Sequence, residues 1–131
     1  MLKILGGLTF ILAATGVVAI TAALAAPAEK QKLLRHIVMY KFKPEVSATQ
    51  VQEVVDTFAA LPSKIDTIRQ FEMGTNVSQE GKSDGFTHVF VVSFADEAGR
   101  DQYLEHPAHQ AYVRVVKDRR EKVLVLDYWT E

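Results

Sequence analysis

Residues 33–42 read Leu-Leu-Arg-His-Ile-Val-Met-Tyr-Lys-Phe, a run rich in β-branched and aromatic side chains. Such a run, followed by Lys43-Pro44, predicts a β-strand. Successive side chains of a strand point to opposite faces, so alternate residues share a face. One face carries His36, Val38, Tyr40 and Phe42, and the other carries Ile37, Met39 and Lys41. Both faces are largely apolar, so we expect this strand to be covered on both sides.

Two helical regions are predicted after this strand. Ser47 begins a capping box with Gln50, and apolar residues then recur at helical spacing until Pro62. Asp96 is placed to cap the second region. The His106-Pro107 step divides that region into two pieces, because a residue before proline is pushed out of helical geometry.

Three further strands are predicted at residues 68–74, 86–94 and 123–129. The charged run from Lys117 to Lys122 is interpreted as the solvated end of the preceding helix. The element order is then β-α-β-β-α-β. This is the α+β, ferredoxin-like order, a four-stranded antiparallel sheet with helices on one face.

The predicted strands are apolar on both faces, although the helices of this fold cover only one. An apolar sheet face left open to water marks an interaction surface. The simplest partner is the same face of a second copy. The sequence therefore predicts a homodimer.

Residues 1–28 have the pattern of a secretory signal peptide, with Lys3 as the only charge, a long apolar run and a small-residue end. Signal peptidase would cut before Ala26 or before Glu29. The run is also long enough to cross a membrane as an uncleaved anchor, so both interpretations stay open. We favour cleavage, place a folded domain at residues 29–131, and expect a periplasmic or secreted protein, with inner-membrane anchoring as the alternative.

Several classes of function are excluded by what the sequence lacks. The 131 residues include no cysteine, which rules out disulfides and thiolate zinc sites. A net charge of −1 gives no reason to expect nucleic acid. There is no glycine-rich phosphate loop and no Gly-x-Ser-x-Gly motif, so we expect no nucleotide cofactor and no serine nucleophile. His106 and His109 do not form a known zinc signature, and no metal is predicted.

A phenol, a carboxylate and two imidazoles lie within the seven residues Tyr103-Leu-Glu-His-Pro-Ala-His109. Pro107 fits the first turn of a helix, which places His109 in that turn. The helix dipole disfavours a positive charge there, so a neutral imidazole is expected near pH 7. These residues predict His109 as a general base and Tyr103 as a weak acid. The alternative for Tyr103 is a packed ring with its hydroxyl at the surface.

Five segments in this order resemble one known family: residues 36–44, 74–78, 87–90, 103–109 and 126–128. The chain from about Leu34 to Trp129 resembles the stress-responsive dimeric α/β-barrel (Dabb) family. The resemblance implies a dimer whose two sheets close into a barrel. Many members are described only as stress-responsive, whereas one plant branch consists of polyketide cyclases that perform an intramolecular aldol condensation without a cofactor.

For the site, the cyclase branch implies His109 as the base, assisted by Tyr103, with His36 and His88 lining the same cavity. Tyr40 and Phe90 are added as ligand-binding candidates on the same strand faces. We expect an exported homodimer whose pocket between sheet and helices holds a small apolar or aromatic molecule. Whether this protein is an enzyme stays open. The alternative is a non-catalytic stress or envelope dimer, which a cavity filled by Phe90 and Tyr40 packed on His109 would favour.

Overall fold

The computed structural model describes residues 30–131, so the predicted signal peptide or anchor at residues 1–28 lies outside the described part. The elements follow in the order β1 (Leu34–Phe42), α1 (Ala48–Ala59), a short 3₁₀ helix (Leu61–Ser63), β2 (Ile68–Thr75), β3 (His88–Phe94), α2 (Glu97–Glu105), α3 (Pro107–Val116) and β4 (Arg120–Trp129). The predicted β-α-β-β-α-β order is confirmed, with its second helical region in two pieces.

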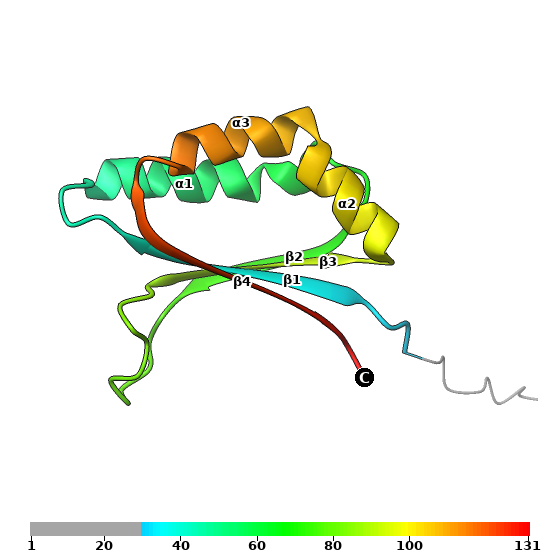
Figure 1. Ribbon diagram of the computed structural model, residues 1–131, viewed down its shortest axis with the longest axis horizontal. Helices are drawn as coiled ribbons and strands as arrows, with labels where there is room; N and C mark the ends of the chain where they lie inside the picture. Colours follow the sequence, from blue (N-terminus) through cyan, green and yellow to red (C-terminus); the bar gives the residue numbers. More distant parts are fainter. Residues whose placement is uncertain (1–29) are drawn as a thin grey trace, which may run out of the picture.

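All strand pairs of the sheet are antiparallel, in the order β2-β3-β1-β4, so the two-faced strand β1 is central and β4 lies at an edge. Figure 1 shows α1, α2 and α3 together on one side of the sheet. The α+β, ferredoxin-like fold is therefore confirmed. Among residues 30–131, no helix is both long enough and apolar enough to span a membrane.

Local side chains set where the helices begin. Ser47 and Gln50 form the predicted capping box, each side chain bonding to the other residue's backbone N–H. Asp96 accepts a hydrogen bond from the Gly99 N–H and caps α2. His106 ends α2 and caps α3, because its Nδ1 accepts from the Ala108 N–H. His106 therefore has a structural role in the bend between the two helices.

The interpretation of the charged run is wrong for Arg120, Glu121 and Lys122, which belong to β4 and not to a helix end. The helix α3 ends at Val116. These charged residues continue the strand because their backbones pair with β1 and their side chains find partners. Glu121 accepts from Lys41 at 3.0 Å, and Lys122 donates to Asp84 at 2.9 Å.

The hydrophobic core lies between the helices and one face of the sheet, where the largest fully buried side chains are Tyr103, Tyr112, Phe58, Phe90 and Phe94. The opposite face, which we call the open sheet face, consists of Ile37, Met39, Val89, Val91, Leu124, Leu126 and Tyr128. Within residues 30–131 no helix covers it (Figure 1). Leu126 is 55% exposed and Tyr128 is 47% exposed. The predicted two-faced apolar character of the sheet is thus present in the structure.

Candidate functional site

A cavity of about 460 Å³ lies between the sheet and the helices, alongside the edge strand β4. It is lined by His36, Val38, Tyr40, Phe58, Arg100, Asp101, Tyr103, Leu104, His109, Tyr112, Val113, Arg120, Val123, Val125 and Asp127. The edge strand is only partly covered by the helices, so Val123 and Val125 remain exposed beside the cavity. The lining combines an apolar wall with a small number of polar groups, as small-molecule sites do.

Four of the six residues expected at a pocket line this cavity: His36, Tyr40, Tyr103 and His109. The expectation that His88 shares it is wrong. His88 lies at the other end of the sheet, paired with Tyr40 and not with His36. There its ring packs on Phe42, with the centroids 5.2 Å apart.

Phe90 does not line the cavity either. It is 1% exposed and packs edge-on against Phe58, with ring centroids 4.3 Å apart. Phe90 therefore packs against Phe58, which lines the cavity, and does not itself face the interior of the cavity.

The hydrogen bond of His109 identifies which of its ring nitrogens carries a hydrogen. Its Nδ1 lies 3.0 Å from the backbone oxygen of Leu104. A carbonyl oxygen can only accept, so Nδ1 carries the hydrogen and Nε2 keeps a free lone pair. Burial lowers the pKa of His109, the bond to Leu104 opposes this change, and the nearby His36 lowers the pKa a little further. A neutral imidazole with an available Nε2 results at neutral pH.

Tyr103 is fully buried, and its hydroxyl has no hydrogen-bond partner among residues 30–131. Its ring lies 4.4 Å from that of His109 and 5.7 Å from that of His36, measured between centroids. Burial raises the pKa of Tyr103 far above its usual range, so the hydroxyl stays protonated. An unsatisfied buried hydroxyl costs about 1–3 kcal/mol. A bound molecule with an acceptor at this point would remove that cost.

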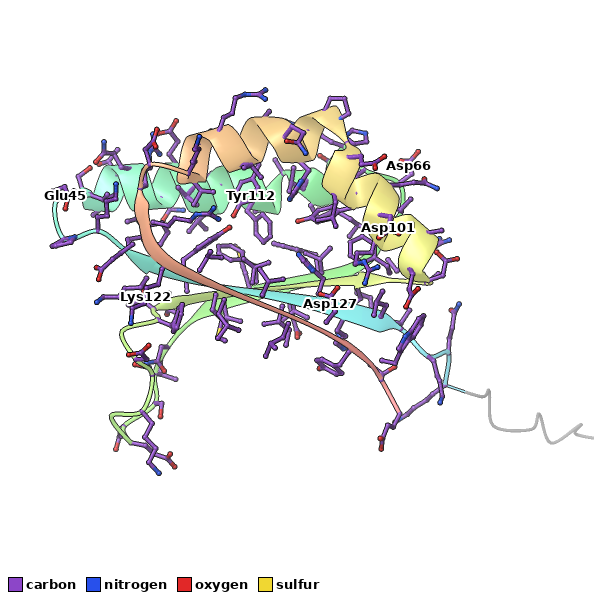
Figure 2. All side chains as sticks on the ribbon, viewed as in Figure 1. Glu45, Asp66, Asp101, Tyr112, Lys122 and Asp127 are labelled. Carbon is purple, nitrogen blue, oxygen red and sulfur yellow. The ribbon has the colours of Figure 1, made fainter. Side chains whose placement is uncertain are left out.

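A chain of charged groups holds His36. Its Nδ1 lies 2.7 Å from one oxygen of Asp127, and the other oxygen accepts from Arg100 at 3.0 Å. Arg100 also donates to Asp101 at 2.9 Å. Because a carboxylate oxygen accepts, Nδ1 of His36 carries the hydrogen of this bond. Figure 2 shows Asp127 on the edge strand and Asp101 on α2 above it.

Sequence reasoning missed Arg100 and Asp127 as functional residues. Asp127 lies directly opposite His36 in the β1–β4 register, and that pairing is the signal that identifies it. Arg100 lies 27 residues from Asp127 in the chain, and only the packing of α2 on the sheet brings them together.

The far end of the cavity is formed by two tyrosines and an arginine. The hydroxyls of Tyr40 and Tyr112 are hydrogen-bonded to each other. Figure 2 shows Tyr112 pointing from α3 toward the sheet. Burial raises the pKa of Tyr40, and the guanidinium of Arg120 near it works against this rise. Within residues 30–131, no three His, Cys, Asp or Glu side chains lie close enough together to hold a metal ion.

Comparison with known proteins gives three findings. The family model described as Stress responsive A/B Barrel Domain matches residues 34–130. The chain is 32% identical over 95 residues to the stress-response A/B barrel domain-containing protein HS1 of Arabidopsis thaliana, covering 72% of this chain and 87% of that protein. It is also 32% identical over 95 residues to olivetolic acid cyclase of Cannabis sativa, covering 72% of this chain and 94% of the cyclase.

A solved structure extends the likeness to three dimensions. It is described as a dimeric ferredoxin-like protein of unknown function from Jannaschia sp. CCS1. The two chains are 28% identical and superpose with a TM-score of 0.64, covering 73% of this chain and 97% of that one. The similarity thus extends across the strands and helices that build the cavity.

Proposed function

The chain belongs to the stress-responsive A/B barrel (Dabb) family, and on that basis we propose that it is a homodimeric, cofactor-independent acid/base enzyme. Its substrates are small, largely apolar or aromatic carbonyl compounds. The single observation that carries the proposal is the pairing of His109 with Tyr103. A free imidazole nitrogen and a buried hydroxyl with no partner among residues 30–131 belong to one cavity, on rings 4.4 Å apart.

The proposed reaction is cyclase-like, in keeping with the 32% identical relative named a cyclase. His109 Nε2 takes a proton from the carbon next to a carbonyl group, and the electrons of the C–H bond move into an enolate. The Tyr103 hydroxyl donates a hydrogen bond to the enolate oxygen. The enolate carbon then attacks a second carbonyl of the same molecule, and the proton on His109 passes to the new alkoxide.

A non-catalytic dimer is the alternative function, and the cavity argues against it. A cavity filled by Phe90 and Tyr40 packed on His109 would favour that alternative. Instead Phe90 packs on Phe58, and Tyr40 bonds to Tyr112. The homodimer itself is supported by the open sheet face and by the dimeric Jannaschia relative.

Deuterium exchange tests the proposed base without knowledge of the natural substrate. In D₂O, each proton removed from the methyl group of an aryl methyl ketone is replaced by deuterium from the solvent. The loss of the methyl signal in the ¹H NMR spectrum measures the exchange rate. We expect the protein to accelerate exchange into ketones such as 4-acetylbenzamide. In His109→Gln the acceleration falls about 100-fold or more, since general-base catalysis contributes about 10²–10⁴.

The pH profile and two further variants make this test specific. Exchange requires neutral His109, whose pKa is lowered, so the rate rises with pH below about 6.5 and is level by neutral pH. Tyr103→Phe loses the hydroxyl and about 100-fold in rate. His88→Gln removes an imidazole outside the cavity and keeps the wild-type rate. A protein that exchanges no faster than buffer, or a fully active His109→Gln variant, contradicts the proposed chemistry.

We further propose that residues 1–28 direct export and are then removed. The support is the sequence pattern alone. Expression of the full chain in a bacterial host, fractionation and N-terminal sequencing test this directly. A periplasmic or secreted protein beginning at Ala26 or Glu29 is expected. An intact chain in the membrane fraction would indicate the anchor instead, and an intact chain in the cytosol would contradict export.

A further inference from the structure

Four cationic residues lie where α3 ends and β4 begins, namely Lys117, Arg119, Arg120 and Lys122, and of these four Arg120 alone lines the cavity. Arg119 bonds to Glu53 at 2.7 Å and to the backbone oxygen of Gln50. Lys122 bonds to Asp84 at 2.9 Å. Arg120 lines the cavity, and no carboxylate of residues 30–131 lies within salt-bridge distance of its guanidinium.

The position of Arg120 explains why its side chain reaches the cavity. Arg120 pairs with Phe42 across the β1–β4 ladder, so it lies on the helix-facing side of the sheet. It lines the same cavity as Tyr40, where its positive charge works against the rise that burial causes in the pKa of that phenol. The side chain is only partly exposed to solvent.

The two tyrosines beside Arg120 leave a hydrogen-bond donor available. Each hydroxyl carries one hydrogen, and the bond between Tyr40 and Tyr112 uses only one of the two. The acids that line the cavity, Asp101 and Asp127, are both held by Arg100 at the other end. The Arg120 end therefore offers donors and positive charge, and no carboxylate from the described part of the chain neutralises them.

We propose that the ligand of this cavity carries a carboxylate, bound by Arg120 and the Tyr40–Tyr112 pair. Planar carboxylates match the fork of donors on a guanidinium. The proposal rests on the proposed function, because it names the substrate class for the same cavity. The ligand's reacting carbonyl then lies beside His109 and its carboxylate beside Tyr112. Both residues are on α3, with their ring centroids 6.0 Å apart.

The two ends of the cavity also set the size of the compound. His36 and Tyr40 are four residues apart on β1, about 13 Å at 3.3 Å per residue. Tyr103, with its unpartnered hydroxyl, lies at the His36 end. An elongated aromatic keto acid fits this layout, with its carbonyl toward Tyr103 and His109 and its carboxylate toward Arg120.

A matched pair of compounds tests the inference. 4-Acetylbenzoate and 4-acetylbenzamide have nearly the same shape, and only the first is charged. Titration calorimetry on the protein without its predicted signal peptide (residues 29–131) should show the acid binding at least about tenfold more tightly than the amide. Arg120→Gln should weaken binding of the acid by about 10- to 100-fold and change binding of the amide by less than about twofold, as expected for a lost charge-assisted bond.

Arg119→Gln is the matched control, since it removes the same charge from the adjacent residue outside the cavity. It should leave the preference for the acid unchanged. Equal binding of acid and amide to the wild-type protein overturns the carboxylate proposal, and so does an equal loss of acid affinity in both arginine variants.

Failure of this inference is distinguishable from failure of the proposed function. If His109→Gln abolishes deuterium exchange into 4-acetylbenzamide while acid and amide bind equally, the base survives and the carboxylate site is rejected. If the acid binds in an Arg120-dependent way and no exchange is accelerated, the carboxylate site survives and the acid/base chemistry is rejected.

Discussion

Leu126→Lys is expected to convert the dimer into a folded monomer. Leu126 is 55% exposed and lies opposite Ile37 on the open sheet face. A two-fold interface uses the same patch on both subunits, so one substitution introduces two lysines into the interface. Burying an unpaired ammonium group costs several kcal/mol, so two lysines in this apolar interface strongly oppose association. Sedimentation velocity at matched protein concentrations would measure the loss of the dimer.

Val77→Lys is the matched control for this prediction. Val77 is also apolar and is 87% exposed, but it lies in the connection between β2 and β3, outside the open sheet face. It should leave the dimer intact. Circular dichroism would check that Leu126→Lys retains the wild-type secondary structure. A Leu126→Lys protein that sediments as a dimer would contradict the assignment of this face to the interface.

Phe58→Ala is expected to lower the free energy of unfolding by about 3–5 kcal/mol, the range for truncating a buried phenylalanine. Phe58 is fully buried on α1 and packs against three rings. The centroid distances are 4.3 Å to Phe90, 4.5 Å to Tyr112 and 5.6 Å to Phe71. Removing the ring leaves a void that these neighbours can only partly close. Urea unfolding at one fixed protein concentration would measure the loss, because dimerisation adds to apparent stability.

Phe58→Leu provides the comparison. Leucine retains much of the apolar volume, so the loss should be less than about 1.5 kcal/mol. Phe58 also lines the cavity, and its truncation enlarges the space beside Tyr112. A Phe58→Ala loss as small as that of Phe58→Leu would mean that the aromatic cluster does not organise the core.

The fold was predictable because its signals are local. The Ser47 capping box, the Pro107 helix start and the alternation along residues 33–42 each depend on neighbours within a few residues. The charged run was misinterpreted because Lys41 and Asp84, the partners of Glu121 and Lys122, are distant in the sequence. Charge by itself does not distinguish a solvated helix end from an edge strand with paired side chains.

The site was predictable in part. The nearness of Tyr103 to His109 follows from the break at His106-Pro107, which joins the end of α2, carrying Tyr103, to the first turn of α3, carrying His109. The sequence determined this local pair. The sequence also determined that the sheet would be apolar on both faces. These features depend on the order of residues and on local backbone geometry.

Only the tertiary structure decided which distant side chains meet. Antiparallel register places Asp127 opposite His36, and it places His88 opposite Tyr40, four residues away from His36. The docking of α2 brings Arg100 to Asp127, and the closure of the helices over the sheet buries the Tyr103 hydroxyl without a partner among residues 30–131. The physical reason is that strand order, register and packing set the distances between residues far apart in the chain, and these distances determine which polar groups are satisfied within the fold and which are left for a ligand.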